Sequence, residues 1–145
     1  IQPQLAAFTR AGIAVTCHAY ANNRRDEESD DALCRLAGLC RFRAGGLPED
    51  KGKPPAERDS VFFPAAETGS RRVMRGFGVG EYYHTQIEEV LTAVRRAADR
   101  NEVLTIFSHA IQPGAKGIHM PTETLEAILK ECSKLGVKAV GFDEL

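Results

Sequence analysis

The sequence has almost no net charge and no long apolar run. It carries 19 Lys and Arg against 20 Asp and Glu, so its formal net charge is −1. Nucleic acids and anionic membranes attract strongly basic surfaces, which this balance does not supply. No apolar run approaches the roughly 20 residues with which a helix crosses a bilayer. We therefore expect no nucleic-acid partner and no membrane span, and the length of 145 residues fits a single domain over 1–145.

Several motifs of known chemistry are also missing. None of the four cysteines stands in a C-x-x-C pair, which excludes zinc knuckles and redox motifs of that type and leaves buried free thiols as our expectation. The sequence has no H-x-x-x-H or H-E-x-x-H pair, no G-x-S-x-G and no Walker A motif. Gly76, Gly78 and Gly80 lie where we predict no strand before a helix, so they do not form a dinucleotide-binding loop. We expect no metal site built from this chain alone.

The sequence does contain an alternation of helical and strand-like patterns. Helices are predicted at 3–11 with Leu5 and Phe8 facing inward, at 27–37, from Thr85 onward and from Pro121 to Leu135. Strands are predicted at 13–17, 39–43, 61–63, 102–108 and 137–142, with 44–58 and 65–82 irregular. Thr85 and Glu88 have the spacing of a capping box, which places the start of the third helix.

This alternation is typical of an α/β fold with a mostly parallel sheet covered by helices. Because right-handed crossovers dominate, the carboxyl ends of parallel strands lie at one edge of the sheet. The loops at 18–26 and 109–119 both follow predicted strands. We therefore expect these two loops to approach each other at the edge where such folds place their chemistry.

The first loop concentrates polar side chains directly after a strand. Tyr20, Asn22, Asn23, Arg24 and Arg25 supply amides, guanidinium groups and a phenol within six positions. One interpretation is that they bind a polar substrate such as a sugar, or orient an acidic residue. The alternative is that the two asparagines form a turn and that the arginines are solvated.

The second loop begins with a histidine that ends an apolar strand. His109 has a side chain that can donate or accept a proton near neutral pH. His119 precedes the last helix and is expected to line the rim of the same site, whereas we expect no catalytic role for His84. The alternative is that His109 only terminates its strand. A further spacing, His18 to Asn22, would place one imidazole and one amide together, but an amide is a weak ligand for zinc.

Three stretches resemble the carboxyl-terminal part of the polysaccharide deacetylase domain, the NodB homology domain of carbohydrate esterase family 4. Residues 18–25 with 28–33 resemble a loop that reads F-A-Y-P-x-N/G-x-R and then E-T-D-x-x-L in many members. Residues 107–111 resemble the late motif in which a histidine and usually an aspartate follow an apolar strand. Residues 119–145 resemble the closing helix and strand.

The resemblance implies a distorted (β/α) barrel with mostly parallel strands, of which residues 1–145 are the C-terminal portion. It implies a hydrolase of carbon–nitrogen bonds other than peptide bonds that removes N- or O-acetyl groups from a polysaccharide partner outside the cytoplasm. The family uses a divalent metal, usually zinc, whose Asp and H-x-x-x-H ligands are expected upstream of Ile1. In this chain, His109 is the implied acid, Asn22 lies where the oxyanion is held, and Arg24 or Arg25 orients the base. The implied saccharide contacts are Tyr20, Asn22, Asn23, Arg25 and His119.

The chain departs from the family pattern at two positions. Ala21 replaces the usual proline, and Ala110 replaces the aspartate that usually follows the late histidine and supports it. A rival alignment places His18 and Asn22 on the H-x-x-x-H pair, with its second histidine lost. Two other functions stay open: a carbohydrate-binding relative without catalysis, and an unrelated α/β domain that binds an anion at a helix N-terminus.

Overall fold

The computed structural model describes residues 2–39 and 41–144, without the side chains of residues 36, 37 and 143. Its α-helices are α1 (Gln2–Arg10), α2 (Glu27–Ala37), α3 (Ile87–Arg100) and α4 (Thr122–Leu135). Its main sheet contains β1 (Cys17–Ala19), β2 (Arg41–Gly45), β3 (Phe62–Pro64), β4 (Val73–Gly78) and β5 (Glu102–Phe107). A separate small ladder pairs β6 (Ile111–Gln112) with β7 (Met120–Pro121). Short 3-10 turns lie in several of the remaining connections.

The main sheet is mostly parallel, as the alternation of patterns predicted. Its strand order is β1-β2-β4-β5-β3, and only β3 runs antiparallel to its neighbour, β5. The register pairs Ala19 with Arg43 and Gly78 with Phe107. Because β1, β2, β4 and β5 run in the same direction, their carboxyl ends lie at one edge. The mixed α/β class is thereby confirmed.

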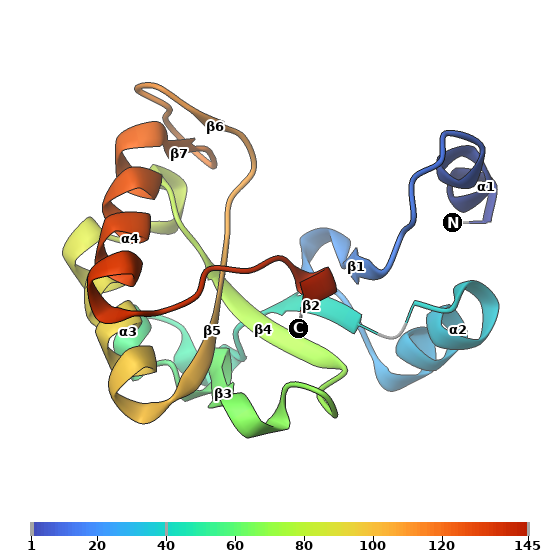
Figure 1. The fold of residues 1–145 in the computed structure, drawn as a ribbon, viewed down its shortest axis with the longest axis horizontal. Coiled ribbons are helices and arrows are strands. Elements are labelled where there is room, and N and C mark those ends of the chain that lie inside the picture. The colour runs from blue at the N-terminus through green and yellow to red at the C-terminus, as the bar shows by residue number, and fades with distance from the viewer. Residues whose placement is uncertain (1, 40, 145) are drawn as a thin grey trace.

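Two hydrophobic clusters lie along the sheet. The larger cluster joins β4 and β5 to α3 and α4 through residues such as Phe77, Val90 and Ile128. The smaller cluster lies at the other end of the sheet, where Leu33 of α2 packs with Leu39 and Phe42. Figure 1 shows the same division, with α3 and α4 side by side at one end and α2 at the other. Each carboxyl-edge loop is thus supported by its own cluster.

Helix ends follow the residue types that the sequence offers, with one shift. Asp26 caps α2 by accepting a hydrogen bond from the Ser29 amide, and Gly38 ends the helix in the left-handed conformation. The cap of α3 is Gln86 with Glu89, so the predicted pair of Thr85 and Glu88 is wrong by one residue. The reason is that the Thr85 hydroxyl is directed back toward the end of β4, where it donates to the Gly78 carbonyl oxygen.

Strand β4 lies in a segment that was predicted to be irregular because it contains several glycines. These glycines are required by close packing, not by a turn. A Cβ on Gly76 would lie 2.6 Å from the Thr105 carbonyl oxygen, and one on Gly78 would lie 2.5 Å from the Tyr83 ring. Glycine inside a strand commonly marks such an approach. The prediction that no strand precedes a helix here is therefore wrong.

The predicted closing strand at 137–142 is also wrong. Residues 137–141 have no regular secondary structure, and Phe142–Glu144 forms a 3-10 turn. The second side of β5 is already occupied by β3, which leaves no partner for a closing strand there. The tail is held instead by Arg41, which donates a hydrogen bond to the Phe142 carbonyl oxygen at 3.1 Å.

The N-terminal part differs from expectation in similar ways. The first strand is Cys17–Ala19 rather than 13–17, and Phe8 of α1 is 45% exposed rather than inward-facing. Leu5 packs against the smaller cluster as expected. Within the described residues, no helix is long and apolar enough to cross a membrane.

The thiol prediction holds for some of the cysteines. Cys132 is free and buried, as predicted, and burial raises the pKa of its thiol. Cys17 is free but only partly buried. Cys34 is disulfide-bonded, so the prediction of a free thiol is wrong there. Cys40 lies outside the described residues.

Candidate functional site

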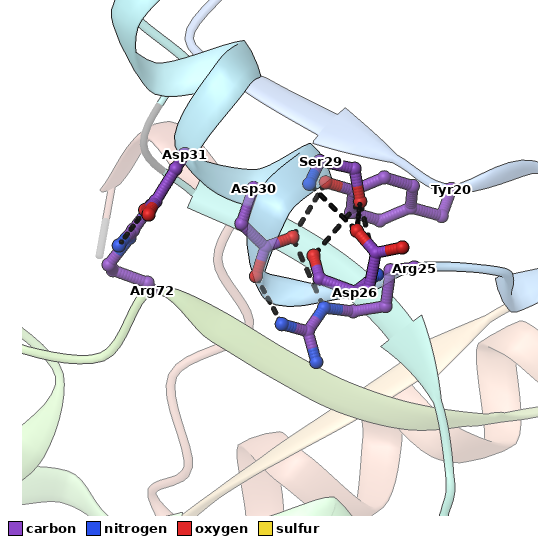
Figure 2. A network of polar contacts seen from close by, with 7 residues as sticks. All are labelled: Tyr20, Arg25, Asp26, Ser29, Asp30, Asp31 and Arg72. Atoms are coloured by element: carbon purple, nitrogen blue, oxygen red, sulfur yellow. Dashed lines mark hydrogen bonds and ion pairs between the residues drawn. The ribbon is translucent and has the colours of Figure 1, made fainter.

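Tyr20 and Arg25 form a buried network with Asp30 (Figure 2). The Tyr20 hydroxyl donates to Asp30 Oδ1 at 2.6 Å, and Arg25 Nε donates to the same oxygen at 3.1 Å. Arg25 Nη2 also pairs with Asp30 Oδ2. Tyr20 is 7% exposed and Asp30 is 4% exposed. The network therefore ties the loop after β1 to helix α2.

Burial and hydrogen bonding set the ionisation of this network. Burial works to raise the pKa of Asp30, but the hydrogen bonds from Arg25 and Tyr20 outweigh it and hold that pKa below its usual value. Burial and the bond to Asp30 together raise the pKa of Tyr20 to about 12. The phenol therefore stays protonated and the carboxylate stays ionised at neutral pH. The Tyr20 hydroxyl and the Arg25 guanidinium therefore both have a partner inside the protein. The saccharide contacts predicted for these two residues stay predictions.

The two asparagines after Tyr20 adopt a backbone conformation that is costly for a residue with a side chain. Asn22 has φ 53° and Asn23 has φ 57°, both in the left-handed region, and both residues are exposed. Arg43 Nη1 donates to Asn23 Oδ1, which anchors the turn to β2. Gly45 leaves room for this contact, because its Cβ would lie 2.8 Å from Asn23 Cγ. Arg24 is exposed and forms no ion pair within the described part of the chain.

Arg43 is the residue that the sequence reasoning missed. Its guanidinium carbon lies 4.3 Å from the centroid of the Phe107 ring, a cation–π contact between β2 and β5. Burial lowers the pKa of Arg43, and no ion pair to this side chain occurs among the described residues. Burial and the nearby Arg43 charge also lower the pKa of His18. The available signal was an arginine between two apolar positions near the end of a strand.

Aromatic rings continue from Phe107 to the turn after β4. Tyr83 contacts Phe107 edge-to-face at 5.7 Å, and Tyr82 contacts Tyr83 in the same manner at 5.4 Å. Tyr82 itself is 65% exposed. We call Asn23, Arg43, Phe107, Tyr83 and Tyr82 the edge row. Each member contacts the next, so the row connects the ends of β1, β2, β4 and β5.

The histidine loop lies beside the Tyr82 end of the edge row. The Tyr82 amide donates to the Gly117 carbonyl oxygen at 2.9 Å, and the Gly117 amide donates to Glu81 Oε2 at 3.1 Å. Because Glu81 and Tyr82 belong to the turn after β4, these bonds fix the loop against that turn. The loops at 18–26 and 109–119 follow β1 and β5, whose carboxyl ends lie at the same edge with β2 and β4 between them. The expected approach of the two loops to each other stays a prediction.

Two imidazoles meet in this loop. His109 is exposed, His119 is partly buried, and their ring centroids lie 6.3 Å apart at an interplanar angle of 89°. The Ala110 amide donates to His119 Nδ1 at 3.1 Å. His84, for which we expected no catalytic role, is exposed and has φ 50° at the end of the turn Glu81–Tyr83.

The donor set of this edge does not fit zinc. Structural and catalytic zinc sites use three or four protein ligands. No group of three or more His, Cys, Asp or Glu side chains that could hold a metal ion occurs among the described residues. His119 has its Nδ1 engaged by Ala110, so the two imidazoles at the loop do not offer a free chelating pair.

Comparisons of the chain with family models, with curated protein sequences and with solved structures found no match.

Proposed function

We propose that this chain supplies the saccharide-binding edge and the acid residue of a polysaccharide deacetylase of the NodB homology type. In this proposal residues 1–145 are the C-terminal portion of a distorted (β/α) barrel. The observation that carries the proposal is an exposed histidine, His109, in the loop after β5 at the carboxyl edge of a parallel sheet. The same loop accepts, at the Gly117 carbonyl oxygen, a hydrogen bond from the backbone amide of the exposed Tyr82. The resemblance of residues 18–33, 107–111 and 119–145 to that family supports the same assignment.

The composition of the edge suits a neutral, hydroxyl-rich ligand. Exposed Tyr82 offers a flat apolar face held by Tyr83, and such a face packs against the C–H groups of a sugar ring. Exposed Asn22, Asn23 and Arg24 offer hydrogen-bonding groups at the other end of the edge row. A few placed polar groups around an apolar surface are the usual arrangement for small-molecule recognition.

His109 supplies the proton in the proposed reaction. A water molecule gives one proton to the aspartate base that the family resemblance implies and adds as hydroxide to the acetyl carbon. The bond from that carbon to nitrogen or oxygen breaks, and acetic acid leaves and ionises to acetate. The His109 imidazolium donates its proton to the departing nitrogen or oxygen, which leaves as an amine or a hydroxyl group. Since the residues described here do not fit a metal ion, we assign no step of this chain to one.

The proposed barrel is supported by what covers each face of the sheet, helices on one face and the C-terminal tail on the other. Phe42 packs toward α2, and its neighbour Arg41 points to the opposite face, where it holds the tail at Phe142. In Figure 1 the tail after α4 runs past β5 and β4 toward β2. Helices on one face of a parallel sheet are the arrangement of a barrel wall.

Acetate release from partially acetylated chitooligosaccharides by the natural full-length protein tests the proposal. We expect His109→Asn to lower turnover by about 100-fold or more, the contribution of a placed acid. His84→Asn is the matched control, because His84 is an exposed histidine outside the histidine pair. Turnover by His109→Asn that matches the wild type would contradict the assignment.

A carbohydrate-binding relative without catalysis is the second candidate. It is favoured by the hydrogen bond from Ala110 to His119 Nδ1, which commits one of the two imidazoles to holding the loop. Saccharide binding without acetate release by the full-length protein would establish this candidate in place of the first.

A further inference from the structure

We propose that His119 is a hydrogen-bond donor of fixed tautomer, which presents Nε2–H to an oxygen atom of the bound ligand. In this role His119 is neither a metal ligand nor a proton acceptor at Nε2. The inference rests on the proposed function only for the identity of the ligand, a saccharide. The tautomer itself follows from contacts within the chain.

The tautomer is set by one hydrogen bond. The Ala110 amide donates to His119 Nδ1 at 3.1 Å, so Nδ1 must present its lone pair. A neutral imidazole carries a single N–H, and that hydrogen must then be on Nε2. Moving it to Nδ1 would bring two donors face to face. A metal ion at Nε2 would require that same move, and a metal ion at Nδ1 would have to displace the Ala110 amide.

The backbone around both residues holds this bond in place. Ile111 pairs with Met120 in the β6–β7 ladder, and the Met120 amide donates to the Ala110 carbonyl oxygen at 2.9 Å. The His119 backbone packs closely on Gly80, where an added Cβ would lie 2.7 Å from the His119 carbonyl oxygen. Because Ala110 and His119 are fixed relative to each other, the imidazole cannot exchange tautomers without losing a constrained contact.

The neighbouring groups favour an oxygen-rich ligand. His119 lies at 6.3 Å from His109, ring centroid to ring centroid, and Tyr82 is bonded through its amide to Gly117, two residues before His119. A ligand at this loop would meet a donor at His119 Nε2, and the exposed Tyr82 ring belongs to the turn to which the loop is bonded. Hydroxyl and carbonyl oxygens of an acetylated sugar accept such a bond, whereas a cation would be repelled by an N–H group.

Nitrogen NMR of the imidazole rings tests the tautomer directly, without any ligand. At a pH where the His119 ring is neutral, we expect its signals in the wild type to show a protonated Nε2 and an unprotonated Nδ1. His84 serves as the internal reference, since its side chain is exposed. We also expect zinc to leave the His119 signals unchanged. A protonated Nδ1, or zinc binding that is abolished by His119→Asn, would overturn the inference.

Two substitutions distinguish the contributions of Nδ1 and Nε2 of His119 to the affinity for partially acetylated chitooligosaccharides. In His119→Gln the side-chain amide can still place an N–H near the position of Nε2. In His119→Asn an oxygen can still accept from Ala110 near the position of Nδ1, but nothing remains at Nε2. We expect His119→Asn to weaken binding about tenfold, the size of one lost hydrogen bond, and His119→Gln to retain most of the affinity. The reverse order would overturn the donor role.

The two proposals fail differently. If the wild type binds no saccharide but NMR shows Nε2–H at His119, the proposed function is contradicted and the fixed tautomer stands. If saccharides bind and the protonated nitrogen is Nδ1, the proposed function stands and the donor role of His119 is contradicted. Melting temperatures of both variants near that of the wild type establish that neither result comes from unfolding.

Discussion

The two ends of the carboxyl edge, at the loop after β1 and at the loop after β5, carry similar residue types in opposite surroundings. At one end Tyr20 and Asp30 are buried, and Arg25 is partly buried and pairs with Asp30. At the other end Tyr82 and His109 are exposed, and the His109 ring contacts the ring of His119. Both ends follow parallel strands, so their position in the chain gives them equal weight as candidates. Burial and partners distinguish them: the first end holds the structure together, and the second is free to meet a ligand.

This difference shows that neighbours in space decide whether the polar groups of a strand-end loop stabilise the fold or stay exposed. The Tyr20 phenol and the Arg25 guanidinium turn inward because α2 brings Asp30 to them. The histidine loop is fixed through its backbone, by bonds to Glu81 and Tyr82, which leaves His109 and the Tyr82 ring outside. Substitutions in the network of Tyr20, Arg25 and Asp30 should therefore change stability, and substitutions at Tyr82 or His109 should change ligand binding.

The largest expected effect is at Asp30. Asp30→Ala leaves a buried phenol and a largely buried guanidinium without their partner, so we expect the free energy of unfolding to fall by about 3–5 kcal/mol in urea denaturation. Asp31→Ala is the matched control one residue away, because the pair of Asp31 with Arg72 is about half exposed, 52% and 46% (Figure 2). We expect that control to lose less than about 1 kcal/mol. Equal losses would show that the buried network does not stabilise this end.

A smaller effect is expected at Tyr20, and its pH dependence identifies the cause. Tyr20→Phe removes the hydrogen bond to Asp30 and should cost about 1.5 kcal/mol at neutral pH. The pKa of Tyr20 is raised to about 12 in the folded protein, whereas a tyrosine in an unfolded chain ionises near pH ~10. The unfolded state therefore releases the proton first, and the stability from Tyr20 declines as pH rises through this window. Urea denaturation across this pH window should show the free energy of unfolding of the wild type falling toward that of Tyr20→Phe. A difference between the two proteins that does not change with pH would contradict the raised pKa.

The smallest effect on stability is expected at Tyr82. Tyr82→Ala should change the free energy of unfolding by no more than about 0.5 kcal/mol, because the side chain is on the surface. Its affinity for acetylated chitooligosaccharides should nevertheless fall by about tenfold, since the aromatic face is lost. Phe8→Ala is the control, as Phe8 is 45% exposed on α1, outside the edge row. Calorimetry that finds the same affinity in both variants would remove the distinction between the two ends.

Much of the fold could be predicted from local patterns. The apolar stripe of α4 and its end at Gly136, the cap of α2 and the parallel arrangement all depend on residues close in sequence. The errors involve contacts between distant residues. Gly76 suggested a loop because its need for space arises from Thr105, which no local window around it contains. Residues 137–142 suggested a strand because only the sheet order shows that β3 already occupies its place beside β5.

The candidate site shows the same distinction between local sequence patterns and contacts of distant residues. The sequence by itself determined that polar side chains follow β1 and that a histidine follows β5, because strand ends are marked by local changes in hydropathy. The tertiary structure decided which of them are available: it buried Tyr20 against Asp30, placed Arg43 between Asn23 and Phe107, and set the tautomer of His119 through Ala110. Burial and hydrogen bonding are properties of neighbours in space, and only the folded chain brings those neighbours together.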